Sequence, residues 1–174
     1  MIAVAIQCGE AWENGTDWDV LALKAVTEAA LQTPHGDLVN EAATVEISVK
    51  LADNSEVQAL NAAYRGKDKP TNVLSFPMVQ ADMLAGLANS DDGEILLGDI
   101  VLAREVCAAE AEAKHIAIAD HATHLIVHGM LHLLGYDHET GEAEAEAMEA
   151  MERSALAALG IADPYKSIVN PHEV

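Results

Sequence analysis

The stretch DHATHLIVHGMLHLLGYDH, residues 120–138, holds five of the eight histidines in the chain. Its apolar residues return with helical spacing as far as Leu134. Gly135 follows, and glycine readily adopts the left-handed conformation that ends a helix. We therefore predict a central helix over residues 120–134, with a turn directly after it.

Three of these histidines have the spacing of a zinc site. His128 and His132 are four residues apart, which places them one turn apart on the same helix face. A turn at Gly135 would bring the chain back, so that His138 completes a triangle of imidazoles. Three neutral imidazoles that leave a fourth position to water are typical of catalytic zinc. We expect one Zn²⁺ per chain, held by the central helix and the loop that follows it.

The spacing H-x-x-x-H-x-x-G-x-x-H is also that of metzincin proteases, in which a glutamate follows the first histidine and acts as general base. Gly129 occupies that position here, so peptide hydrolysis by that mechanism is not expected. His121 and His124 lie on nearly the same helix face as His128 and leave a different ligand set open. We expect them around the site or in the core, and we expect Asp137 to orient a ligand or to move protons.

Outward from the histidine stretch, strand and helix patterns alternate. Strands are expected at residues 1–7, 44–51, 73–77 and 94–102, and the 73–77 strand, which ends at a proline, suits a sheet edge. Helices are expected after Asp17, from Asp53 to Gly66, and over 103–114, 120–134 and 140–159. With no linker and no internal repeat, residues 1–174 indicate one α+β domain with about five helices.

The charge balance limits the binding partners. Nine Lys and Arg against 29 Asp and Glu give a net charge of −20, which disfavours indiscriminate binding to nucleic acid. Three of the nine basic residues, Arg65, Lys67 and Lys69, lie together in the loop RGKDKPTN, residues 65–72. An arginine there could grip two phosphate oxygens and stabilise charge that builds on them. Six glutamates within residues 139–152 indicate a solvated helix.

The remaining features suggest a cytoplasmic setting without a membrane. No apolar stretch reaches the length that crosses a bilayer, and the N-terminus lacks the pattern of a secretory signal. Cys8 and Cys107 stand far apart in sequence, so we expect reduced thiols that are both inert in the core.

Three blocks of the sequence, HGMLHLLGYDH (128–138), LNAAYRGKDKPTNVLSFP (60–77) and LLGDIVL (96–102), resemble the YbeY family of bacterial rRNA maturation endoribonucleases. The resemblance implies an α+β fold with a small mixed sheet. It also implies zinc held by His128, His132 and His138, a functional arginine at Arg65, and cleavage of single-stranded RNA. The implied roles are rRNA processing, maturation of the small ribosomal subunit and ribosome quality control.

The leading hypothesis is therefore a zinc-dependent endoribonuclease acting on rRNA, with a zinc-bound hydroxide or the ribose hydroxyl of the RNA as nucleophile. The alternatives are a zinc hydrolase of a small phosphoester or peptide, and a noncatalytic ribosome assembly factor with a structural metal. Structural zinc normally has four protein ligands, so three histidines favour catalysis. Because the chain is so acidic, we expect a ribosomal protein or an assembly GTPase to deliver it to the RNA.

Overall fold

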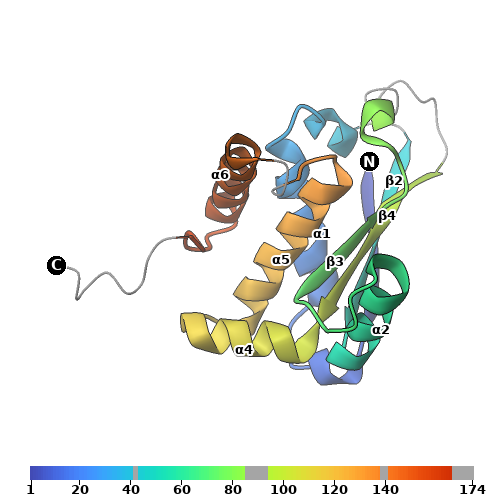
Figure 1. Cartoon of the computed structure of the whole chain (residues 1–174). Coiled ribbons are helices and arrows are strands. Elements are labelled where there is room, and N and C mark those ends of the chain that lie inside the picture. Colours follow the sequence, from blue (N-terminus) through green and yellow to red (C-terminus); the bar gives the residue numbers. More distant parts are fainter. Residues whose placement is uncertain (41–42, 85–93, 138–140, 166–174) are drawn as a thin grey trace.

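The computed structural model describes residues 1–40, 43–84, 94–137 and 141–165, and its centre is a mixed sheet. The strands are β1 (Ile2–Cys8), β2 (Thr44–Ala52), β3 (Val73–Pro77) and β4 (Glu94–Ala103), in the order β1-β2-β4-β3 (Figure 1). The first, second and fourth strands are parallel, while β3 runs antiparallel to β4 at the sheet edge. The expected strands and the mixed sheet are confirmed.

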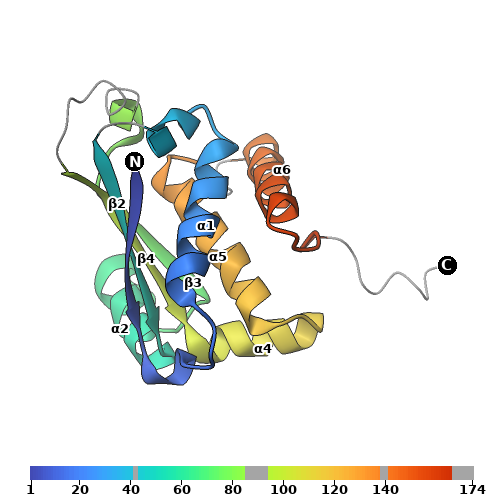
Figure 2. The same ribbon diagram turned by 180° about the vertical axis from the view of Figure 1, so that it is seen from behind.

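Five α-helices among the described residues surround the sheet. They are α1 (Trp18–Leu31), α2 (Asn54–Arg65), α4 (Arg104–Lys114), α5 (Ile118–Leu133) and α6 (Glu142–Ala158). Helices α1 and α5 cover one face of the sheet, α2 lies on the other, and α6 packs against α1 and α5 (Figures 1 and 2). The predicted α+β class and helix number are confirmed.

Strict alternation along β2 fixes which face of the sheet is the core. Val45, Ile47, Val49 and Leu51 are buried, whereas the residues between them are only partly covered. These four side chains join the main core with residues of α1 and α5. The central helix α5 is buried on most of its surface, and this helix carries the histidines.

The helix ends follow the signals read from the sequence. The carboxylate of Asp17 accepts the Val20 backbone N–H at the start of α1, and Asp53 accepts the Glu56 N–H at the start of α2. Gly66, at φ 69°, ends α2 in the left-handed conformation. Since Arg65 is the last helical residue, this turn sends the basic loop out from the end of α2.

A local irregularity in β4 brings α5 close to the sheet. The pairing with β2 shifts by one residue, so that Gly98 lies opposite Ile47 while Leu96 lies opposite Glu46. A Cβ atom built on Gly98 would lie 2.6 Å from the Phe76 carbonyl oxygen and 2.6 Å from Leu133 Cδ2. Only glycine at this position lets both β3 and the last turn of α5 lie so close to β4.

The expectation for the cysteines is half wrong. Cys107 is buried, and burial raises the pKa of its thiol to about 12. Cys8 is exposed, and it is the last residue of β1, a strand at the edge of the sheet. Within the described residues, no helix has both the length and the apolar character needed to cross a membrane.

Candidate active site

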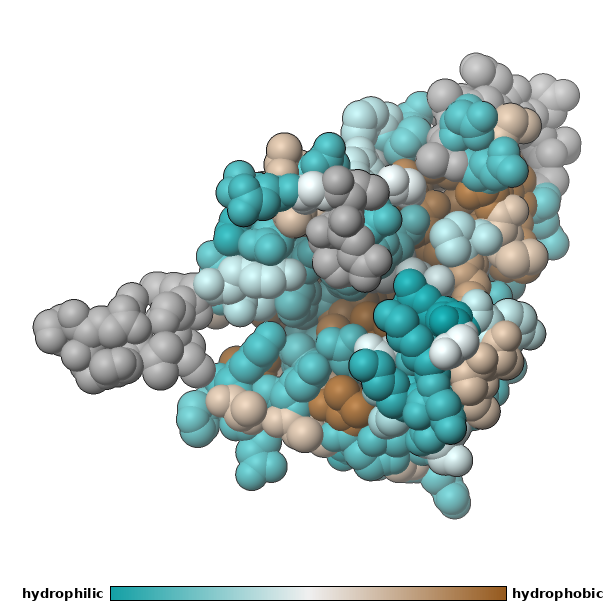
Figure 3. Space-filling view, viewed as in Figure 1, coloured by the Kyte–Doolittle hydropathy of each residue, from teal (hydrophilic) through white to brown (hydrophobic). Residues whose placement is uncertain are grey.

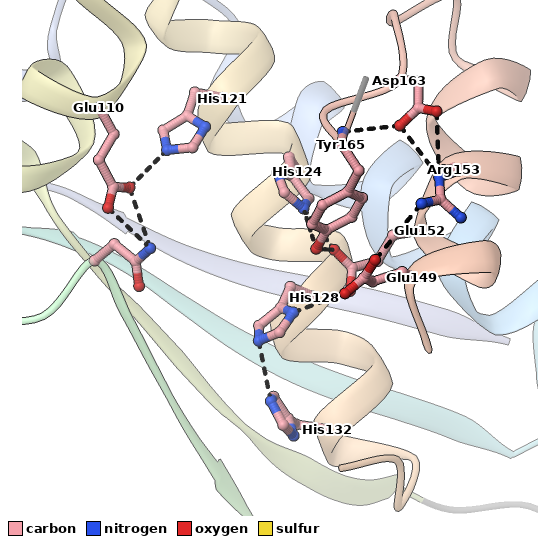
Figure 4. Close-up of polar contacts among 11 residues, drawn as sticks. Glu110, His121, His124, His128, His132, Glu149, Glu152, Arg153, Asp163 and Tyr165 are labelled. Carbon is pink, nitrogen blue, oxygen red and sulfur yellow. Dashed lines mark hydrogen bonds and ion pairs between the residues drawn. The ribbon is translucent and has the colours of Figure 1, made fainter. Parts of the chain in front are cut away.

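His128 and His132 face each other on one side of α5 (Figure 4). Their Nε2 atoms are 3.1 Å apart, and their rings are nearly perpendicular at 84°. Both residues line one cavity. The one-turn spacing predicted from the sequence therefore brings two imidazole nitrogens to a common point.

The other ring nitrogens of this pair are held by acceptors. His128 Nδ1 lies 3.1 Å from a carboxylate oxygen of Glu152, and His132 Nδ1 lies 2.8 Å from the Tyr136 carbonyl oxygen. A carboxylate or carbonyl oxygen only accepts, so each Nδ1 must carry the proton. In the neutral imidazole each Nε2 is then an acceptor, which is the form that ligates a metal.

The geometry of the pair fits a zinc ion. Two nitrogens bound at about 2.0–2.1 Å to one tetrahedral zinc lie roughly 3.3 Å apart. The 3.1 Å between the Nε2 atoms of His128 and His132 is close to this separation.

The third predicted ligand, His138, lies outside the described residues. Within residues 1–40, 43–84, 94–137 and 141–165, no three His, Cys, Asp or Glu side chains are grouped as a metal site requires. Asp137, the last described residue before this gap, lines the cavity with His128 and His132. The zinc site as a whole thus stays a prediction, while two of its histidines are placed together.

Glu152 of α6 is the functional residue that the sequence analysis missed. Its carboxylate is 1% exposed and contacts His124, His128 and Tyr165 (Figure 4). Burial alone would raise the pKa of Glu152, but hydrogen bonds from these three residues lower it to about 2. The expectation of a fully solvated acidic helix is therefore wrong at this position.

His121 lies nearer the start of α5 and belongs to a second polar group. Its Nε2 is 2.7 Å from Glu110 of α4, whose carboxylate also accepts the Asn72 side-chain amide at 3.1 Å. Burial lowers the pKa of His121, although its bond to Glu110 opposes the shift. Its Nδ1 is buried with no hydrogen-bond partner among the described residues, so protonation would bury a second N–H unpaired. His121 thus lies beside the site, as expected.

The basic loop also borders this cavity. Arg65, Lys67 and Lys69 line the same space as His128 and His132. The Asn61 side chain donates to the Lys69 carbonyl at 2.9 Å, and the Asn61 carbonyl accepts the Lys67 N–H at 3.2 Å. One residue of α2 thereby holds the loop in place, so the three cations project from a defined backbone.

The cavity between these walls has a volume of about 790 Å³. Its basic wall comes from the end of α2 and the loop after it, and its acidic wall comes from Asp137, Glu149 and Glu152. In Figure 3 apolar residues come to the surface between the hydrophilic residues of α6 and those of α2. A phosphate group in this space would meet the cations on one side and the paired imidazoles on the other.

Gly129 is buried against the sheet and does not face the cavity. A Cβ built there would lie 3.0–3.3 Å from three side-chain atoms of Ile100 in β4. A glutamate at this position would put a charge into the core. The residue that serves as base in proteases with this spacing therefore has no place in this fold.

Comparison with known proteins agrees with these features. The family model described as Endoribonuclease YbeY matches residues 12–160. An Endoribonuclease YbeY of Rhizorhabdus wittichii is 62% identical over 165 residues, which cover 95% of this chain and 97% of that protein. One from Sphingopyxis alaskensis is 57% identical, covering 95% and 98%.

A solved structure shares the fold. The solution structure of TM1509 from Thermotoga maritima superposes with a TM-score of 0.52 and 22% sequence identity. The match covers 96% of this chain and 100% of that one. At this identity the likeness concerns the arrangement of the helices and strands.

Proposed function

This chain belongs to the Endoribonuclease YbeY family, and from that premise we propose that it is a zinc-dependent endoribonuclease that cleaves single-stranded RNA in rRNA processing. One observation carries the proposal from the structural side. Arg65, Lys67 and Lys69 line the same cavity as His128 and His132. Metal ligands and phosphate-binding cations thus share one space.

The proposed ligands are His128, His132 and His138, and they hold one Zn²⁺. Zinc supplies Lewis acidity, because it lowers the pKa of coordinated water towards about 7 and offsets phosphate charge. His128 and His132 would present Nε2 to the ion, because these are the nitrogens that face each other.

Arg65 is the proposed catalytic cation. Its guanidinium can donate two parallel hydrogen bonds to nonbridging oxygens of the scissile phosphate. Charge builds on these oxygens as the phosphodiester is attacked, so donors aimed at them lower the barrier. Lys67 and Lys69 bind flanking phosphates as point charges.

The cellular role proposed is maturation of the small ribosomal subunit and ribosome quality control, in the bacterial cytoplasm. Residues 1–174 act as one domain in this proposal. A net charge of −20 weakens unaided RNA binding, so a ribosomal protein or an assembly GTPase delivers the enzyme to its rRNA.

The first experiment measures zinc content and cleavage of single-stranded and duplex rRNA fragments, before and after chelation. A nuclease loses cleavage on chelation and regains it with zinc. A chelator-sensitive enzyme that leaves RNA intact but hydrolyses a small phosphoester or peptide would support the zinc hydrolase instead. Zinc without any activity would support an assembly factor with a structural metal.

The second experiment tests Arg65. Arg65→Ala should slow single-turnover RNA cleavage by about a hundredfold to a thousandfold, as losing one oxyanion donor does. Arg65→Lys should recover only part, because an ammonium cannot make the two-pronged contact. Zinc content and melting temperature should stay the same, because an exposed arginine contributes little to folding. Lys24→Ala, which removes an exposed cation of α1, is the control. Wild-type cleavage by Arg65→Ala would rule out this role.

A further inference from the structure

The buried carboxylate of Glu152 connects its own helix, α6, to α5 and to the segment after α6. Oε1 accepts from His124 Nε2 at 2.5 Å and from the Tyr165 hydroxyl at 2.7 Å, while Oε2 accepts from His128 Nδ1 at 3.1 Å. The two histidines belong to α5, the glutamate to α6, and the tyrosine to the segment after α6. The carboxylate thus contacts a candidate metal ligand at Nδ1, the ring nitrogen that does not face His132.

Burying a carboxylate at this position is unfavourable unless other groups compensate its charge. Glu152 lies on the apolar face of α6, among the buried Met148, Ala155 and Leu156. An uncompensated charge there would be strongly unfavourable, whereas an apolar residue would simply extend the core. The other described glutamates of α6 are not buried. Helix packing alone therefore does not account for Glu152.

The two histidine Nδ1 atoms are held by partners of different strength. His132 donates to a backbone carbonyl, whereas His128 donates to the carboxylate of Glu152. A carboxylate partner makes an imidazole a stronger ligand and fixes its ring orientation. Because Nδ1 of His128 is tied to Glu152, its Nε2 points towards His132 Nε2.

Tyr165 holds the carboxylate from the far side. Its hydroxyl donates to Glu152, its backbone N–H donates to Asp163 at 2.8 Å, and Arg153 lies over its ring at 5.4 Å. Arg153 also pairs with Asp163 (Figure 4). These contacts fix the segment after α6 against the cavity, which Tyr165 itself lines.

We propose that Glu152 is a positioning residue that holds His128 in its metal-ligating tautomer and orientation, with Tyr165 and His124 fixing the carboxylate. This rests on the proposed function, because it takes His128 as a zinc ligand. In this proposal Glu152 is not itself a zinc ligand. Its effect reaches the site through His128 Nδ1.

The test compares zinc affinity among Glu152→Gln, Tyr165→Phe and the wild type, by competition with a chelator. Glu152→Gln keeps the shape but loses the charge, and it should weaken zinc binding by about 10- to 100-fold, as loss of such a partner does. Tyr165→Phe removes one hydroxyl, so its loss should be smaller, about tenfold at most. Glu146→Gln, which removes an exposed charge from the same helix, should bind zinc as the wild type does.

Two further readouts separate positioning from support of the fold. The visible spectrum of the Co²⁺-substituted protein reports ligand geometry, and it should change in Glu152→Gln and not in Glu146→Gln. The melting temperature of each metal-free variant reports folding; should Glu152→Gln fail to fold, Tyr165→Phe carries the comparison. Equal zinc affinities and equal cobalt spectra in the wild type and the folded variants would overturn this inference alone. A wild type that binds no zinc would overturn the proposed function.

Discussion

His121 illustrates how its surroundings fix the charge state of an imidazole near the site. It is 1% exposed, and burial lowers its pKa below the usual 6.5. The folded protein therefore keeps His121 neutral at a pH where the unfolded chain has already taken up a proton. Since the unfolded state then binds more protons, the free energy of unfolding falls as the pH drops below 6.5.

This predicts the pH dependence of a variant. His121→Gln keeps a side-chain donor for Glu110 but cannot take up a proton. Denaturant unfolding of the metal-free protein between about pH 7.5 and 5.5 should show a shallower loss of stability for the variant than for the wild type. His35→Gln, a change of a histidine outside this group, should keep the wild-type slope. Identical slopes for wild type and His121→Gln would contradict the assignment.

Some residues of the site could be predicted from the sequence, and others could not. His128 and His132 could be found because helical spacing alone makes residues four apart neighbours. Glu152 was hidden among other glutamates, and its partner His124 lies 28 positions away in the chain. A signal was present: Glu152 lies four residues after Met148 and four before Leu156, in line with the apolar stripe of α6. A charge in an apolar stripe indicates a buried partner.

Among the elements, the contact between β4 and α5 sets how closely the histidine helix approaches the sheet. Gly98 leaves no room for a side chain between the Phe76 carbonyl and Leu133. Leu133 follows His132 directly, so a displacement here would move a candidate ligand.

Gly98→Ala should therefore destabilise the protein. The added methyl group would lie 2.6 Å from a backbone oxygen, which must move, and such overpacking costs about 1–3 kcal/mol. The measurement is the denaturant midpoint of the metal-free protein. Gly36→Ala is the matched control, because its nearest neighbour would be 3.4 Å away, an ordinary contact. Equal midpoints for the two variants would show that β3 and α5 can move apart at no cost.

Local pattern predicted the elements but not the order in which the strands pair. The alternation of β2 and the caps at Asp17 and Asp53 are properties of neighbouring residues, and the structure confirms them. The insertion of β4 between β2 and β3 depends on contacts across about fifty residues, which local periodicity does not encode.

The molecule as a whole is strongly acidic, but several of its few basic residues are grouped around one cavity. The chain carries −20, yet three of its nine cations line one wall of the cavity. Phosphates are therefore repelled by most of the surface and attracted at one place. This arrangement favours binding of RNA along the end of α2.

The salt dependence of RNA binding tests this arrangement. Each lysine that neutralises a phosphate contributes about 0.7 to the slope of log affinity against log salt for a single strand. Lys67→Ala and Lys69→Ala should each reduce the slope by that amount, measured with metal-free protein so that the RNA stays intact. Lys24→Ala should leave the slope unchanged. Equal reductions in all three variants would indicate a diffuse effect of net charge.

The clamp around Tyr165 also has a consequence for biosynthesis. The cavity takes a wall from α2, its imidazoles from α5, and its carboxylate support from α6 and the segment after it. A chain that emerges from the ribosome exposes these parts in that order. The sheet also cannot be completed until β4 has been made, because β4 pairs with both β2 and β3. The last of these contacts, between Tyr165 and Glu152, thus forms only after residue 165 has been made. A nascent chain therefore lacks this support of the Glu152 carboxylate until Tyr165 has emerged.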